Sequence, residues 1–185
     1  MPRAPELDPT KLTEEQSRVF GEIQRRLRSA NPTAAVRGPF AVLLNAPHVA
    51  EGAIRAYSSF REGKIERRLF ELMILVVARN MTAQYEWFAH APHAIAAGIT
   101  PEAVEAIRNR RTPILTREDE RMVYDVATEL CTARTLSQSA YDRAHAILGL
   151  EQLIELIAGT GFYIMIATVL NAFDVAVPGN EKLLP

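Results

Sequence analysis

Apolar residues recur at a helical period along most of the chain. Thr13 and Gln16 form a capping-box pattern, and apolar residues then recur three and four positions apart as far as Leu27, before Asn31-Pro32 ends the segment. Strict alternation of apolar and polar residues, which is typical of strands, is nearly absent. Further helices are predicted over 40–45, 48–61, 66–79, 83–97, from Thr100, and over 116–130, 137–148 and 150–173. We expect a single-domain, all-α bundle of about eight helices.

The last predicted helix contains an unusually long uncharged segment. Residues 156–173 carry no charge over 18 positions, which is near the lower limit for crossing a bilayer. The segment contains glycine, threonine and asparagine, and acidic residues flank it where a membrane helix would have lysine or arginine. We interpret it as a central helix covered by the fold or by a partner subunit, and not as a membrane span.

Composition and charge exclude several classes of protein. The 185 residues carry a formal net charge of −1, which argues against a nucleic-acid-binding protein and against a polybasic membrane-surface protein. The N-terminus lacks the apolar core of a signal peptide, so we expect a cytoplasmic location. The one cysteine, Cys131, cannot form an internal disulfide, a four-thiolate zinc site or a dithiol redox centre, and we interpret it as a buried, inert thiol.

The strongest candidate chemistry lies in two neighbouring helices. On the second helix, Glu86 and His90 are about 40° apart on one face, with Cβ atoms about 6 Å apart. A carboxylate at that spacing can orient the imidazole and fix its tautomer, which makes a plausible proton-transfer pair. Glu71 adds a second acid within a strongly apolar helix, where an unpaired carboxylate is costly. We therefore predict Glu71, Glu86 and His90 as catalytic residues.

Other readings of these residues stay open. A Glu–His pair four residues apart is common on helices without any function, and a structural hydrogen bond could also explain Glu71. His93 shares the stripe of Glu86 and His90 and could complete a set of three metal ligands. No HExxH motif supports a metal, so we expect neither a metal nor another cofactor. Arg67, Arg68 and Arg79 could bind an anionic substrate, although solvated arginines on helix faces are commoner.

Aromatic and amide side chains near this region could contact a substrate. Tyr85 precedes Glu86, and Tyr163 and Asn171 lie two turns apart in the long apolar helix. We predict these three as substrate-binding residues, whereas Trp87 is more typical of a core residue.

The segment RRLFELMILVVARNMTAQYEWFAHAPHAIAAGITPEAVEAIR resembles the carboxymuconolactone decarboxylase family, which includes alkylhydroperoxidase D. The upstream GPFAVLLNAPHVAE and the downstream GFYIMIATVLNAFDVAVP fit the same family, so the resemblance covers about residues 35–178. It implies an all-helical fold of the alkylhydroperoxidase D-like type and a homo-oligomer with its site near a subunit interface. Residues 1–34 would then be an N-terminal helical extension and 179–185 a tail on the surface.

One departure from the family pattern decides which branch of the family the sequence resembles. The peroxidases carry a glutamate, two cysteines three apart and a histidine, which fall here on Glu71, Ala83, Glu86 and His90. Ala83 and Glu86 replace both thiols, so a dithiol peroxidase mechanism cannot operate. The resemblance implies instead a cysteine-free, cofactor-independent lyase or isomerase acting on a small lactone or carboxylate. The alternatives are a non-catalytic ligand-binding or structural helical oligomer, and a metal-assisted hydrolase or hydratase.

Overall fold

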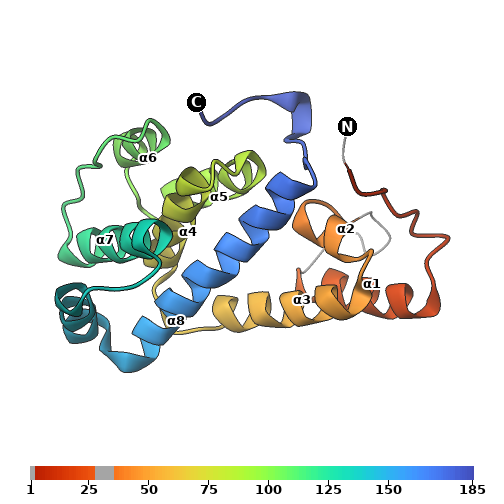
Figure 1. The fold of residues 1–185 in the computed structure, drawn as a ribbon, viewed down its shortest axis with the longest axis horizontal. Coiled ribbons are helices and arrows are strands. Elements are labelled where there is room, and N and C mark those ends of the chain that lie inside the picture. The colour runs from red at the N-terminus through yellow and green to blue at the C-terminus, as the bar shows by residue number, and fades with distance from the viewer. Residues whose placement is uncertain (1–2, 28–35) are drawn as a thin grey trace. The chain divides into compact units, whose positions relative to one another are not determined.

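The computed structural model describes residues 3–27 and 36–185, and these residues form α-helices with no strand (Figure 1). The prediction of an all-α fold is therefore confirmed for the described residues. The expected end of the first helix at Asn31-Pro32 lies outside them. The helices are α1 (Glu14–Arg26), α2 (Pro39–Leu43), α3 (Pro47–Arg61), α4 (Arg67–Asn80), α5 (Gln84–Ala96), α6 (Pro101–Arg108), α7 (Glu118–Ala133) and α8 (Gln138–Ala172), followed by the short 3-10 helix η1 (Pro178–Asn180).

Local sequence signals account for several helix ends. The Thr13 hydroxyl accepts a hydrogen bond from the Gln16 amide, and the Gln16 side chain accepts one from the Thr13 amide, which completes the predicted capping box. Gly98 follows α5 with φ of 109°, a conformation that favours glycine. At Gly149, with φ of 73°, α8 kinks between the two helices that the sequence predicted separately.

The described residues group into two compact units. The first comprises residues 1–62 with 169–175, and the second comprises 63–168 with 176–185. In the first unit, α3 packs against α1 and α2, and Val19, Ile23 and Ile54 are completely buried. The single domain over residues 1–185, with its extension and tail, stays a prediction.

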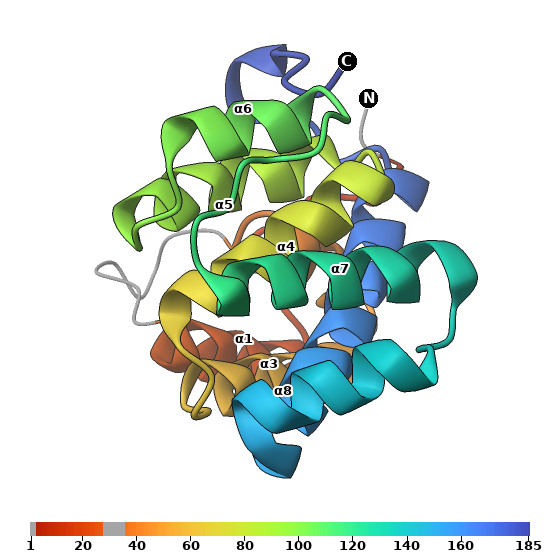
Figure 2. The ribbon, with the colours of Figure 1, turned by 90° about the vertical axis from the view of Figure 1, so that its left-hand side faces the viewer.

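Helix α4 is the core of the second unit. It packs against α5, α6 and α7 (Figure 2), and residues 72–78 are at most 1% exposed. Burying a leucine, isoleucine or valine side chain contributes about 1.5–3 kcal/mol, so a helix that is apolar on all sides is stable only when neighbours cover every face. The sequence of α4 thus requires the helices that surround it.

Helix α8 approaches α4 closely within the second unit. A Cβ atom on Gly159 would lie 3.0 Å from Phe70 Cε2 and 3.2 Å from Met73 Cε, so only glycine fits this contact without a shift. Near the start of α4, the Glu155 carboxylate accepts hydrogen bonds from the backbone amides of Lys64 and Ile65 at 2.9 and 2.8 Å. By length and composition α8 could cross a membrane, with a mean hydropathy of 1.9 over 18 residues, of which 44% are buried in the structure.

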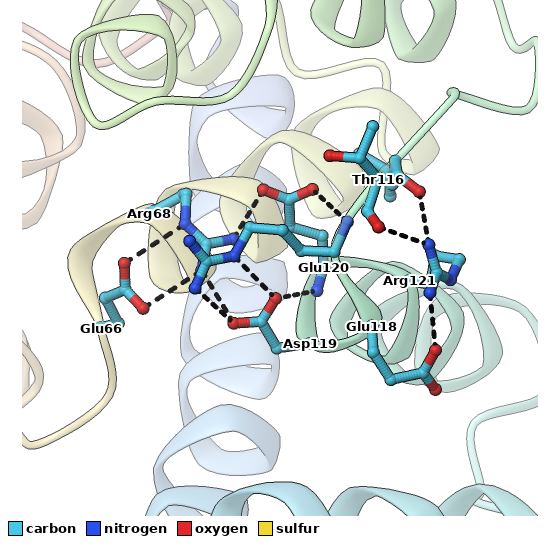
Figure 3. Close-up of polar contacts among 9 residues, drawn as sticks. Glu66, Arg68, Thr116, Glu118, Asp119, Glu120 and Arg121 are labelled. Atoms are coloured by element: carbon cyan, nitrogen blue, oxygen red, sulfur yellow. Dashed lines mark hydrogen bonds and ion pairs between the residues drawn. The ribbon is translucent and has the colours of Figure 1, made fainter.

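A buried guanidinium joins α4 to α7 (Figure 3). Arg68 is 4% exposed and bonds to Glu120 at 2.6 Å, to Asp119 at 2.8 Å and to Glu66 at 3.1 Å. Burial alone would raise the pKa of Asp119, but the hydrogen bonds and charge of Arg68 and Arg117 lower it overall. The Arg68 guanidinium is therefore occupied by these carboxylates and is not available to an anionic ligand.

The C-terminal tail is anchored on the second unit. Leu184 is completely buried, and the Gln84 side chain accepts hydrogen bonds from the Leu183 and Leu184 amides at 2.8 Å and donates one to the Leu184 carbonyl at 2.9 Å. Arg108 donates to the Leu183 carbonyl at 2.5 Å. The tail predicted to lie on the surface is thus fastened to α5 and α6 at its last residues.

The close approach at Gly159 can be tested against a glycine in the same helix. Gly161 has no atom within 4 Å of its Cβ position, so Gly161→Ala should raise the free energy of unfolding by about 0.5–1 kcal/mol through helix propensity. Gly159→Ala should be at least about 1 kcal/mol less stable than Gly161→Ala, because the new methyl group displaces Phe70. Urea unfolding of both variants measures this, and equal stabilities would contradict the packing described.

Candidate active site

Glu71 on α4 and His90 on α5 form a buried acid–imidazole pair. His90 Nδ1 lies 2.8 Å from Glu71 Oε2. Glu71 is completely buried, whereas the His90 side chain is 15% exposed. The sequence predicted that Glu86 would orient this ring, and that pairing is wrong. Glu71 takes the role because α4 packs directly along α5, a contact between helices that spacing within α5 does not reveal.

Arg67 is the other partner of the Glu71 carboxylate. Its guanidinium forms a close ion pair with Glu71 Oε1, although the two groups are not aligned as a hydrogen bond. The Arg67 side chain is 47% exposed, so one end of the pair reaches the surface. The i, i+4 spacing of an arginine and a glutamate on one helix was the available signal for this contact.

The contact with Glu71 determines which nitrogen of His90 carries a proton. A carboxylate only accepts hydrogen bonds, so Nδ1 donates to the Glu71 oxygen and the neutral ring keeps its lone pair on Nε2. Within residues 3–27 and 36–185, Nε2 makes no hydrogen bond. The imidazole thus presents a free basic nitrogen while Glu71 holds the ring.

Tyr163 of α8 supports the imidazole from the side. The rings of Tyr163 and His90 meet edge to face, with centroids 5.3 Å apart and an interplanar angle of 89°. Phe70 packs on Tyr163 in the same manner at 5.7 Å. Of the three residues predicted to contact a substrate, Tyr163 is therefore the one that the structure places against His90, and it is 4% exposed.

Glu86 is a buried acid in the first turn of α5. It is 2% exposed, and its Oε2 atom is buried without a hydrogen-bond partner. Burial raises the pKa of this carboxyl well above its ordinary value. Burial therefore favours the protonated form of Glu86, which can donate a hydrogen bond.

The remaining predicted residues fall in different places. Tyr85 is half-buried, with its ring 6.1 Å from that of Phe88. Asn171 is exposed and belongs to the first unit, so its role beside Tyr163 stays a prediction. Trp87 is 4% exposed, which confirms it as a core residue. Cys131 is half-buried, and burial raises the pKa of its thiol to about 11, in accord with an inert thiol.

The metal-ligand stripe does not assemble in the described part of the chain. His93 is exposed, and its ring centroid lies 6.3 Å from that of His90. Among the residues described, no group of three or more His, Cys, Asp or Glu side chains could hold a metal ion.

Comparisons with known proteins bear on the family resemblance and on the fold. Residues 49–129 match the model of the Carboxymuconolactone decarboxylase family, which confirms the resemblance over the segment that contains Glu71, Glu86 and His90. A search of curated proteins found no significant match. The apo crystal structure of the debrominase Bmp8 is similar in fold, with a TM-score of 0.66, 14% identity and 92% of each chain covered. The chain thus resembles the carboxymuconolactone decarboxylase family over this segment and shares an all-α fold with Bmp8.

The buried acid predicts a pH dependence of stability. Because the folded-state pKa of Glu86 is raised, the stability that the protonated carboxyl contributes is complete at acid pH and is lost as the pH rises through that pKa. Glutamine cannot ionise, so Glu86→Gln does not lose this contribution. As the pH rises from about 4 to about 8, the difference in free energy of unfolding between Glu86→Gln and the wild type should therefore shift in favour of the variant by at least about 1 kcal/mol.

Urea unfolding across this pH range measures the difference, with the exposed Glu181→Gln as the matched control. If Glu86→Gln followed the wild type as closely as the control does, Glu86 would not be a buried neutral acid.

Proposed function

We propose that this protein is a cofactor-independent acid/base enzyme that acts on a small lactone or related carbonyl compound bearing a carboxylate. The observation that carries the proposal is the contact of 2.8 Å between His90 Nδ1 and Glu71 Oε2, which leaves Nε2 as the free nitrogen of the ring. A held imidazole with one available nitrogen is the arrangement that general acid–base catalysis requires. The match to the Carboxymuconolactone decarboxylase family over residues 49–129 supports a lyase or isomerase reaction.

His90 moves the proton in this proposal, and Glu71 is its positioning residue. Glu71 stabilises the imidazolium that forms when Nε2 accepts a proton, because its buried carboxylate then faces a full positive charge. Arg67 forms an ion pair with the other oxygen of Glu71. The half-exposed Arg67 guanidinium is also suited to attract a substrate carboxylate.

Glu86 is the second acid. Its unpartnered Oε2 and raised pKa make it a hydrogen-bond donor in a buried site, which suits an oxygen that becomes negative during the reaction. A buried carboxyl without a partner is costly unless something else uses it, and substrate is the partner that we assign to it. We therefore assign Glu86 a catalytic and not a structural role.

Decarboxylation of a lactone acid illustrates the chemistry. The bond between the carboxylate carbon and the ring breaks, carbon dioxide leaves, and the electron pair spreads into the conjugated lactone carbonyl. A proton from His90 or Glu86 then restores a C–H bond, so the substrate loses carbon dioxide and gains one proton. Delocalisation in the substrate and donors at the carbonyl oxygen lower the barrier to this step.

The two alternative functions require different roles of the residues in this site. A non-catalytic ligand-binding or structural oligomer would use Glu71 and His90 only as a hydrogen bond between α4 and α5, and would leave the burial of Glu86 unexplained. A metal-assisted hydrolase needs ligands beyond Glu86 and His90, and the described residues gather no such set. Elemental analysis of the purified protein tests the metal alternative directly.

Removal of the imidazole should abolish turnover. With 4-carboxymuconolactone as substrate, we expect His90→Ala to lower kcat by about 10²-fold or more, because general acid–base catalysis contributes at that scale. Loss of ultraviolet absorbance measures the rate. The exposed His93→Ala is the matched control and should keep the wild-type rate.

Full activity in His90→Ala with a preserved fold would overturn the assignment of His90. If wild-type protein turned over neither this lactone nor related enol acids, the proposal of an acid/base lyase or isomerase would fail.

We also propose that the protein is a homo-oligomer that uses α8. Leu150, Ile154 and Met165 of this helix are 55%, 56% and 36% exposed, and their spacing places them on one face. A second copy of the chain that covered this face would remove its exposed apolar surface from water. The sequence predicted that the fold or a partner subunit would cover this long helix. Because Tyr163 of the same helix touches His90, such an interface would lie near the site.

A charge on this face should break the assembly. We expect Ile154→Glu to lower the molar mass in solution towards the 20.6 kDa monomer, since a buried, unpaired carboxylate opposes association. Light scattering coupled to size exclusion measures the mass. Ile114→Glu is the control, because Ile114 is 86% exposed and does not belong to this face. A wild-type monomer, or an unchanged mass in Ile154→Glu, would contradict the proposal.

A further inference from the structure

A cationic pocket lies in the second unit, apart from the Glu71–His90 pair. Residues from the end of α4, from α6 and the segment after it, and from α7 line it, and its volume is about 120 Å³. Three arginines line it, Arg79, Arg110 and Arg111, together with the polar side chains of Asn80 and Tyr124. No carboxylate is among its lining residues. The proposed reaction does not use these residues.

Arg79 is the unusual member of this group. Its side chain is buried, with 6% exposure, and its Nη2 atom donates to the backbone oxygen of Pro185, the last residue of the sequence, at 3.1 Å. The Nε and Nη1 atoms are buried and make no hydrogen bond in the described part of the chain. Burial and then the charge of Arg110 lower its pKa. A buried guanidinium with most of its donors unused is costly to the folded protein.

The chain holds Arg110 at the pocket by local structure. Arg110 follows the end of α6 with φ of 55°, and its Nη2 atom donates to the Thr82 hydroxyl at 3.2 Å. Thr82 follows the end of α4 and has φ of 52°. Both residues thus have the left-handed conformation that ends a helix, which few side chains other than glycine and asparagine adopt readily. Arg110 and Arg111 are exposed and border the pocket from the solvent side.

Nearby acidic groups do not neutralise these arginines. Glu105 is engaged by Asn109 at 2.6 Å and by Arg108 at 3.4 Å, and Arg111 acts on it only through its charge. Asp125, next to Tyr124, pairs with Arg143 at 2.7 Å. Arg110 and Arg111 therefore border the pocket with positive charge that no side-chain carboxylate of the described residues contacts, and Nε and Nη1 of Arg79 have no partner.

We propose that this pocket binds a small oxyanion, either a phosphate group or a short carboxylate. Guanidinium groups bind both through charge-assisted hydrogen bonds, and their planar forks match the oxygen spacing of these anions. The volume suits a small ion or the acidic end of a metabolite and excludes a large ligand. A bound anion would supply partners for the two Arg79 nitrogen atoms that the described residues leave without a hydrogen bond. The site is separate from the proposed catalytic pair, and its test needs no turnover.

Isothermal titration calorimetry with inorganic phosphate and with succinate tests the proposal at low ionic strength, with sodium chloride at matched ionic strength as the reference. We expect a dissociation constant of about 1 mM or tighter for at least one of the two anions. The double variant Arg110→Gln/Arg111→Gln should weaken that binding at least about tenfold, and its exposed positions should leave the fold intact.

Two further variants locate the binding. Arg134→Gln removes the same charge from an exposed arginine of the second unit outside the pocket and should bind as the wild type does. Arg67→Gln reports an anion held at the Glu71–His90 pair. Binding by phosphate alone identifies a phosphate site, and binding by succinate alone identifies a carboxylate site. No heat beyond that of chloride, an unchanged affinity in the double variant, or a loss confined to Arg67→Gln would overturn the proposal.

Discussion

The second unit depends on how it accommodates one carboxylate inside its most apolar helix. Glu71 is completely buried in α4, among residues that contact other helices on every side. An isolated charge there would cost several kcal/mol, so the fold must bring compensating groups to both oxygens. Arg67 supplies one from the same helix, and His90 supplies the other from α5. The same contact joins α5 to α4 and leaves Nε2 of the imidazole without a hydrogen bond among the described residues.

The replacement of thiols by Glu86 changes what this fold can do. In the family pattern, the position of Glu86 holds a redox cysteine, and Cys131 lies elsewhere with a pKa raised to about 11 by burial. The dithiol mechanism is therefore not available at these positions, whereas burial favours the protonated form of Glu86. Bmp8 shares the fold at 14% identity, and a fold alone does not fix a reaction.

Two buried arginines on α4 differ in how many of their guanidinium nitrogen atoms have a hydrogen-bond partner. Arg68, near the start of the helix, is saturated by three carboxylates and joins α4 to α7 (Figure 3). Arg79, near the end, bonds to one backbone oxygen and has two unused nitrogen atoms beside a pocket. Arg68 contributes to structure because each of its three guanidinium nitrogen atoms bonds to a carboxylate. The burial of Arg79 is better explained by a bound anion, because its burial is costly and the described residues leave most of its hydrogen-bond donors unused.

The sequence by itself predicted most of the helices, the capping box at Thr13 and three candidate catalytic residues. Thr13, Gly98 and Gly149 act through backbone conformations that neighbouring residues alone decide, and the apolar period of α4 is a local property of the chain. Which carboxylate meets His90 was decided only by tertiary structure. Glu86 is four residues away on the same helix, but Glu71 reaches Nδ1 because α4 and α5 pack together. The burial of Glu86, the two Arg79 nitrogen atoms without a hydrogen bond and the anchoring of Leu184 likewise depend on contacts between segments far apart in sequence. Periodicity identifies which face of a helix is buried, but it carries no information on which helix covers that face.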